Sequence, residues 1–278
     1  HRMAYVNRII IIEPQCFDHQ YDVKSLIPSL GSLYIASFLK RHFADIAVEV
    51  ISEYVTGAIT DEYIDHLNQI DDNSLLIGIS ITTYNACRGF MLAKKLAHPT
   101  LFGGIHANLN PLECLQHGDF VIGGDGSGII DLVELLLHDD VESIKQHGEE
   151  LQKIADLSYK YRDQTYRSAL KSNGSQVINT RLDYTLINGY FVNSFRRYIR
   201  IPRLLFSSIG CPFNCSFCSI AAAGIKYSTV DIDIVLANFT DLLYQDPVIV
   251  KWFLPKIIWL ADDTLFYHTA RALELFDK

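Results

Sequence analysis

The sequence lacks the long apolar run that a membrane-spanning helix requires, which is roughly 18 residues. Its most continuous apolar runs, residues 9–12 and 75–79, have only the length of a strand. Positive charge is also scarce, since 24 Lys and Arg face 32 Asp and Glu and leave a net charge of −8. This balance argues against a nucleic-acid-binding surface. No signal peptide opens the chain, residues 1–3 are interpreted as preceding the native start, and the expected location is cytoplasmic.

The chain has no internal repeats, and its 49% hydrophobic content is enough to fill a core. Over the first 140 residues, apolar runs alternate with helical patterns, which predicts a doubly wound parallel sheet. Ser29 is the expected N-cap of the first helix. The predicted fold class is α/β, with a Rossmann or flavodoxin-like domain over residues 4–140. The expected strands are residues 8–12, 46–51, 74–82, 100–102 and 120–122, and the expected helices are residues 29–41, 61–70, 86–96 and 129–137.

Residues 141–200 are more polar and are predicted to be a connector, with a turn at Asn173-Gly174 between two short strands. A second alternation fills residues 201–278. Its expected strands are 203–207 and 256–261, and its expected helices are 231–244 and 269–276. Two βα units are the start of a (β/α) barrel, which needs six to eight of about 30 residues each. We therefore expect this barrel to be partial and truncated.

Six cysteines are present, and three of them form the segment Cys-Pro-Phe-Asn-Cys-Ser-Phe-Cys at Cys211, Cys215 and Cys218. Three thiolates at this spacing, on a loop that leaves a strand, suit three irons of a [4Fe–4S] cluster and leave the fourth iron open to another ligand. A structural zinc site is the alternative, but it needs a fourth ligand, and the nearest later candidate is His268. The remaining cysteines, at positions 16, 87 and 114, are expected to be buried structural thiols.

The spacing Cys-x3-Cys-x2-Cys, with the aromatic Phe217 before its last cysteine, resembles the signature of radical S-adenosylmethionine (SAM) enzymes. The resemblance implies that SAM binds the open iron and that Phe217 contacts its adenine. It also implies that Asp262, at the end of the second strand of the barrel, receives the methionine ammonium group. The alternative for Asp262 is an acidic residue that stabilises a helix N-terminus.

The first domain resembles the cobalamin-binding domain that precedes the radical domain in one large subfamily, over about residues 8–138. The similarity is carried by residues 9–14 and 27–36, and by the loops that follow the third, fourth and fifth strands. In an open α/β sheet, ligands bind at these carboxyl ends, where glycine permits close approach of the backbone. The residues implied in cobalamin binding are Ser80, Thr82, Thr83, Tyr84, Gly103, Gly104, His106, Gly123 and Gly124.

Two departures from that family pattern bear on the cobalamin prediction. The Asp-x-His-x-x-Gly motif that supplies a lower cobalt ligand in other cobalamin proteins is absent, with Pro28 near the histidine position, and Asp18-His19 is interpreted as solvated. The segment Gly124-Asp125-Gly126-Ser127 replaces a Gly-Glu-Gly-Glu pattern. The alternative for these glycines is a set of tight turns in a flavodoxin-like domain, with His106 as a capping residue.

The two resemblances together, in this order, imply a cobalamin-dependent radical SAM methyltransferase that acts on an unactivated carbon. The implied cofactors are a [4Fe–4S] cluster, SAM and cobalamin, and the implied partners are a small-molecule or peptide substrate and a low-potential flavodoxin or ferredoxin. The alternatives are a cobalamin radical SAM cyclase, oxidase or ring-contracting enzyme, and a methylthiotransferase-like enzyme without cobalamin. A non-catalytic iron–sulfur or zinc-binding module is a further alternative.

Overall fold

The computed structural model describes residues 6–16, 28–70, 74–172, 176–190, 203–244 and 258–277. Asp18-His19, the predicted turn at Asn173-Gly174 and the first three residues lie outside this part of the chain. So do residue 27 of the cobalamin-domain similarity and the first two residues of the strand predicted at 256–261.

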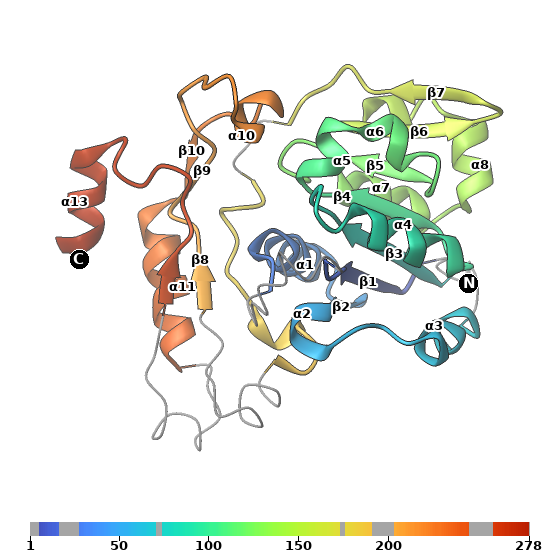
Figure 1. Cartoon of the computed structure of the whole chain (residues 1–278), viewed down its shortest axis with the longest axis horizontal. Helices are drawn as coiled ribbons and strands as arrows, with labels where there is room; N and C mark the ends of the chain where they lie inside the picture. Colours follow the sequence, from blue (N-terminus) through green and yellow to red (C-terminus); the bar gives the residue numbers. More distant parts are fainter. Residues whose placement is uncertain are drawn as a thin grey trace.

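The predicted α/β fold with a mostly parallel sheet is confirmed by a seven-stranded sheet in the order β2-β1-β3-β4-β5-β6-β7 (Figure 1). The first five strands are parallel, and β6 and β7 extend the sheet antiparallel at the β5 edge. The strands are β1 (Arg8–Glu13), β2 (Ala47–Ser52), β3 (Leu75–Ser80), β4 (Thr100–Gly103), β5 (Phe120–Ile122), β6 (Leu157–Tyr161) and β7 (Gln164–Arg167).

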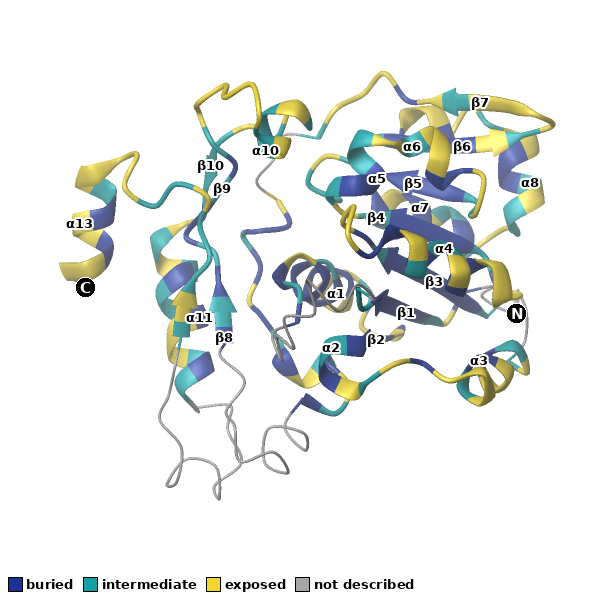
Figure 2. Ribbon diagram, in the orientation of Figure 1, coloured by how far each residue is buried: buried dark blue, intermediate teal, exposed yellow. Residues whose placement is uncertain are grey.

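Helices cover both faces of this sheet, which is why its central strands are apolar throughout. In β1, Ile9 and Ile11 pack against the face covered by α1 and α7, whereas Ile10 and Ile12 pack against the face covered by α3 and α4. Figure 2 shows this buried layer between more exposed helices. The helices of this part are α1 (Leu30–His42), α2 (Glu53–Thr56), α3 (Asp61–Asn68), α4 (Ala86–Lys95), α5 (Ile105–Leu109), α6 (Pro111–Cys114), α7 (Ile129–Leu136) and α8 (Val141–Gln146).

Two local predictions are confirmed only in part or are wrong. Ser29 occupies the predicted N-cap position of α1, but its side chain makes no capping hydrogen bond, and its backbone N–H donates to Glu13 Oε1 at 2.6 Å. The hairpin turn lies at Arg162-Asp163, between β6 and β7, and residues 168–172 and 176–180 form no strand. Both Arg162 and Asp163 have positive φ, of 46° and 61°, which suits the tight turn of a two-residue hairpin.

The second part of the chain carries the cysteine segment. Its strand β8 (Arg203–Leu205) pairs in parallel with β11 (Ile258–Leu260), and the predicted helix between them is α11 (Ile232–Tyr244). The other elements here are β9 (Ser208–Ile209), β10 (Ser228–Thr229), α10 (Ser219–Ala222) and α13 (Thr269–Asp277). Within the described ranges, no helix has both the length and the apolar character of a membrane span.

Candidate functional site

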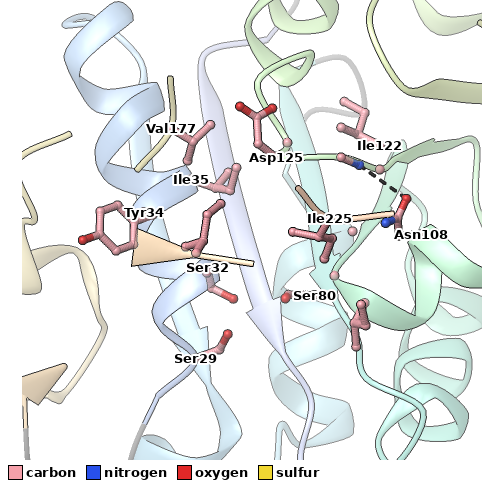
Figure 3. A pocket seen from close by; sticks show the side chains of 18 of the residues that line it. Ser29, Ser32, Tyr34, Ile35, Ser80, Asn108, Ile122, Asp125, Val177 and Ile225 are labelled. Atoms are coloured by element: carbon pink, nitrogen blue, oxygen red, sulfur yellow. Dashed lines mark hydrogen bonds between the residues drawn. The ribbon is translucent and has the colours of Figure 1, made fainter. Parts of the chain in front are cut away.

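A cavity of about 490 Å³ lies at the carboxyl ends of the parallel strands, between the sheet and the cysteine-bearing part (Figure 3). This edge is where open α/β sheets bind ligands. The second part supplies Phe206, Ile209, Gly210, Ile220, Ile225, Ala261 and Asp263 to the lining. The cavity is therefore enclosed jointly by the two parts of the chain.

Six of the predicted cobalamin contacts line this cavity: Ser80, Thr82, Gly103, Gly104, Gly123 and Gly124. They come from the ends of β3, β4 and β5, which meet at one edge because the strands are parallel. The structure thus brings together the loops that the sequence had singled out separately.

Glycine is required in these loops for two different reasons. Gly104 has a φ of 93°, and a Cβ there would lie 2.5 Å from the Ile81 carbonyl oxygen, so its backbone packs directly on the residue that follows β3. At Gly103, by contrast, a Cβ would meet only the Ile122 carbonyl oxygen, at 3.9 Å. A Cβ at Gly103 therefore meets no close neighbour, and Gly103 itself lines the cavity.

Three other predicted contacts lie away from the cavity. Tyr84 is 72% exposed. His106 is buried; its Nδ1 lies 3.2 Å from Thr83 Oγ1, and its Nε2 lies 3.2 Å from a carboxylate oxygen of Glu113. These contacts face His106 away from the cavity, whereas Ile105 and Asn108 of the same helix line it.

Several polar cavity residues were not among the predicted site residues, namely Ser29, Ser32, Asn108, Asp125 and Asp263. Asp125 lies in the segment where the chain departs from the family pattern, so the sequence did mark its loop. Its Oδ1 accepts the N–H of Ser127 at 3.0 Å, and its Oδ2 is buried with no hydrogen-bond partner among the described residues. An acceptor beside a cavity, with no partner of its own, suits a ligand that brings an N–H or O–H donor.

The three cysteines lie on the loop between β9 and α10, with Cys218 at the N-cap position of α10. All three are free thiols; Cys215 is exposed, and Cys211 and Cys218 are half-buried. Within the described ranges, no three His, Cys, Asp or Glu side chains are grouped closely enough to hold a metal ion. As a donor set, three accessible thiols on one anchored loop fit an iron–sulfur cluster better than a four-ligand zinc site.

The segment that follows β11 anchors the beginning of this loop. Asp262 accepts three hydrogen bonds, from the Ser207 N–H at 2.7 Å, the Ser207 hydroxyl at 2.6 Å and the Ser208 hydroxyl at 2.7 Å. Asp263 accepts the Gly210 N–H at 2.9 Å, and the Thr264 hydroxyl donates to Cys211 Sγ at 3.2 Å. Asp262, predicted to receive the methionine ammonium group, is thus engaged with the segment leading to the loop, and its neighbour Asp263 lines the cavity.

The other aromatic and thiol predictions have mixed outcomes. The Phe217 side chain is 90% exposed and lies on the cysteine loop itself. Cys114 is fully buried in an apolar cluster, and this burial raises the pKa of its thiol to about 12. Cys16 is half-buried, and the expectation of a buried thiol is wrong for Cys87, which is exposed on α4.

No family model matches the chain. Two curated proteins resemble it in sequence. An uncharacterized methyltransferase of Pyrococcus horikoshii is 24% identical over 260 residues, covering 89% of this chain and 51% of the relative. The bacteriochlorophyllide d C-8(2)-methyltransferase of Chlorobaculum tepidum is 26% identical over 205 residues, covering 69% and 35%. The chain spans about half the length, or less, of these relatives.

Solved structures share the fold. TsrM from Kitasatospora setae, a radical SAM methyltransferase, superposes with a TM-score of 0.66 and 15% identity, over 98% of this chain and 52% of its own, in a structure with cobalamin and a [4Fe–4S] cluster bound. OxsB, a cobalamin-dependent SAM radical enzyme with aqua-cobalamin bound, gives 0.67 and 16%, over 94% of this chain and 34% of its own. At these identities the likeness establishes the fold.

Proposed function

We propose that the chain is the cobalamin- and cluster-binding part of a cobalamin-dependent radical SAM methyltransferase that acts on an unactivated carbon. The observation that carries the proposal is the joint cavity, in which the glycine loops at the edge of the sheet face the segments flanking the three-cysteine loop. The methyltransferase relatives and the fold shared with TsrM and OxsB support the same assignment.

In this proposal, Cys211, Cys215 and Cys218 bind the cluster, and the glycine loops admit the corrin ring. When bound, the cofactors supply the radical and methyl-transfer chemistry, as cofactors do in general. Asp125 Oδ2, which has no partner among the described residues, would accept a hydrogen bond from an N–H or O–H donor of the cobalamin. Phe206, Ile220 and Ile225 contribute apolar surface to the cavity and would help to exclude water from it.

For SAM, we assign Phe217 to the adenine and the Asp262–Asp263 pair to the methionine end. Asp262 positions the loop through its three hydrogen bonds, and Asp263 offers a carboxylate on the cavity side. Thr83, Tyr84 and His106 are not part of the cavity lining, and we assign them no contact with a cofactor. The proposed partners are a small-molecule or peptide substrate and a low-potential flavodoxin or ferredoxin, in the cytoplasm.

The test is anaerobic reconstitution with iron, sulfide and hydroxocobalamin, followed by desalting, an absorption spectrum and metal analysis. We expect about four irons and one cobalt per chain, as a [4Fe–4S] cluster and one corrinoid require. A variant with all three cysteines of the loop changed to alanine should lose the iron and keep the cobalt. Iron without cobalt would contradict the cobalamin assignment, and zinc alone would contradict the radical assignment as well.

The methylthiotransferase alternative requires a second iron–sulfur cluster, for which Cys16, Cys87 and Cys114 would be the ligands. The complete burial of Cys114 in an apolar cluster argues against that site. Cyclases, oxidases and ring-contracting enzymes of the same architecture differ from methyltransferases in stoichiometry. Counting SAM molecules consumed per product with the true substrate separates them, because a methyltransferase uses one for the methyl group and a second for the radical.

A further inference from the structure

We propose that Asn108 is a positioning residue that couples the cofactor cavity to the cysteine loop, so that a ligand in the cavity is sensed at the helix that follows Cys218. This inference rests on the proposed function for the identity of the ligand. It assigns a role to a residue that lies outside every motif recognised in the sequence.

The side chain of Asn108 joins the two parts of the chain at the cavity wall. Its Nδ2 donates to the carbonyl oxygen of Ala223 at 3.1 Å, across 115 positions of sequence. Its Oδ1 accepts the N–H of Gly124 at 3.4 Å, the contact drawn as a dashed line in Figure 3. The carboxamide of Asn108 is therefore hydrogen-bonded both to the glycine loop after β5 and to the end of α10.

Each of these partners belongs to an element with a place in the site. Ala223 is the C-cap of α10, and the same helix has Cys218 as its N-cap. Ile220 and Ile225, on either side of Ala223, line the cavity. A displacement of Asn108 therefore reaches both the wall of the cavity and the helix that begins at the third cysteine.

The packing around Asn108 leaves it little freedom to adopt another position. A Cβ at Gly123 would lie 2.5 Å from Asn108 Oδ1, so the absence of a side chain at Gly123 makes room for the carboxamide. Its backbone N–H donates to the Gly104 carbonyl oxygen at 3.0 Å. Asn108 is thus held by the first turn of α5, by the space left at Gly123 and by its hydrogen bond to Gly124.

Asparagine suits this link because it presents a donor and an acceptor at the same time. Asn108→Asp keeps an oxygen for the Gly124 N–H but turns the donor toward Ala223 into a second acceptor. Asn110→Asp is the matched control, since it makes the same change of one amide to a carboxylate at the exposed end of the same helix.

The test is hydrogen–deuterium exchange of the amides of residues 222–225, measured on the chain with and without hydroxocobalamin. Without ligand, Asn108→Asp should speed exchange there by about fivefold, as expected for the loss of one hydrogen bond. With ligand, exchange of the same amides should slow in the wild type and in Asn110→Asp. It should stay unchanged in Asn108→Asp even when corrin absorbance shows that this variant holds the ligand.

The outcomes separate the inference from the proposed function. Equal exchange in Asn108→Asp and Asn110→Asp without ligand would overturn the link, as would ligand-induced slowing that persists in Asn108→Asp. If no chain retains hydroxocobalamin, the proposed function fails, and the coupling of a cobalamin ligand to α10 falls with it. In that case the exchange measured without ligand still decides whether Asn108 holds α10.

Discussion

At the scale of single residues, the buried carboxyl group of Glu13 is the clearest electrostatic feature. Glu13 ends β1 and is 5% exposed; its Oε1 accepts the Ser29 N–H, and its Oε2 has no partner among the described residues. Burial raises the pKa of this carboxyl from 4.5 to about 7. The folded protein therefore holds a proton on Glu13 over a pH range in which the unfolded chain has released it.

This proton predicts how stability depends on pH. Because the folded state binds more protons than the unfolded state between pH 4.5 and 7, the free energy of unfolding should fall as the pH rises through that window and level off above it. The contribution of Glu13 to this fall is at most about 3 kcal/mol. The difference between the free energies of unfolding in urea at pH 5 and at pH 8 should be smaller for Glu13→Gln than for the wild type. Glu62→Gln, on the exposed face of α3, should behave like the wild type, and an unchanged pH dependence in Glu13→Gln would refute the assignment.

Gly103 offers a second test at this scale, because the space beside its Cα belongs to the cavity. Gly103→Val should reduce cobalamin retention by about tenfold or more, the equivalent of about 1.4 kcal/mol, since the side chain competes with the ligand for volume. The urea midpoint should change little, because valine is compatible with a strand and its Cβ would meet no close neighbour. Gly103→Ala should have an intermediate effect. Normal cobalt content in Gly103→Val would show that the ligand binds elsewhere.

At the scale of elements, the segment after β11 determines whether the cysteine loop is ordered. Asp262→Ala would leave the N–H and hydroxyl of Ser207, which is fully buried, without their acceptor. We expect a loss of about 2–3 kcal/mol in stability and a lower iron content after reconstitution. The stability and the iron content of Asp262→Asn, which keeps one acceptor oxygen, should lie between those of the wild type and those of Asp262→Ala. Asp233→Ala, on the exposed first turn of α11, is the control, and equal iron content in both alanine variants would remove Asp262 from any role in positioning the loop.

The sequence predicted elements well where a continuous apolar run or a helical apolar period marks them. The strands β1 and β5 are short apolar runs, whereas α4 and α7 repeat apolar residues at helical spacing, and all four lie within a residue or two of their predicted bounds. The short helices α2, α5, α6 and α10 were missed, since one turn of helix carries no readable period. The hairpin of β6 and β7 was not predicted, because Arg162-Asp163 gives a weaker turn signal than Asn173-Gly174, which lies outside the described residues.

For the site, spacing identified the cysteine loop, and the glycine pairs identified the strand-end loops. Which side of α5 faces the cavity could not be predicted, because the orientation of a five-residue helix is set by packing and not by its own pattern. The prediction therefore selected His106, whereas the structure places Asn108 at the cavity. The three hydrogen bonds of Asp262 were likewise invisible, since they join residues more than 50 positions apart.

At the scale of the whole molecule, one apolar cluster extends through both parts of the chain. It includes Leu33 and Tyr34 of α1 together with Leu205, Val235 and Leu242 of the cysteine-bearing part. Tyr34 also stacks on Phe206 with 5.5 Å between ring centroids, and its hydroxyl accepts the Phe206 N–H at 3.3 Å. A continuous core of this kind favours a single cooperative unfolding transition.

The distribution of tryptophan makes this cooperativity measurable. Both tryptophans, Trp252 and Trp259, belong to the second part, whereas most helix and strand residues belong to the first. Tryptophan fluorescence therefore reports on the second part, and far-ultraviolet circular dichroism reports mainly on the first. If the two parts unfold together, thermal unfolding followed by the two signals should give coincident midpoints. Tyr34→Ala, which removes the stacked ring, should separate the two midpoints, and Tyr63→Ala on α3 should not. Separate midpoints in the wild type would show that the two parts unfold independently.

The shared cavity also has a consequence for how the protein is made. The residues that line the cavity extend in sequence from Ile11 to Asp263. When only the first sheet has left the ribosome, the side of the cavity that the second part supplies is still missing, and the side that is present is open to water. Roughly 85 further residues separate Ile178, the last cavity residue before the second part, from Asp263, and they take about 4–17 s to synthesise at 5–20 residues per second. During that interval the surface opposite the glycine loops is incomplete. The cavity is therefore completed late in synthesis, and translation speed over this stretch sets how long the nascent sheet edge stays exposed to other chains.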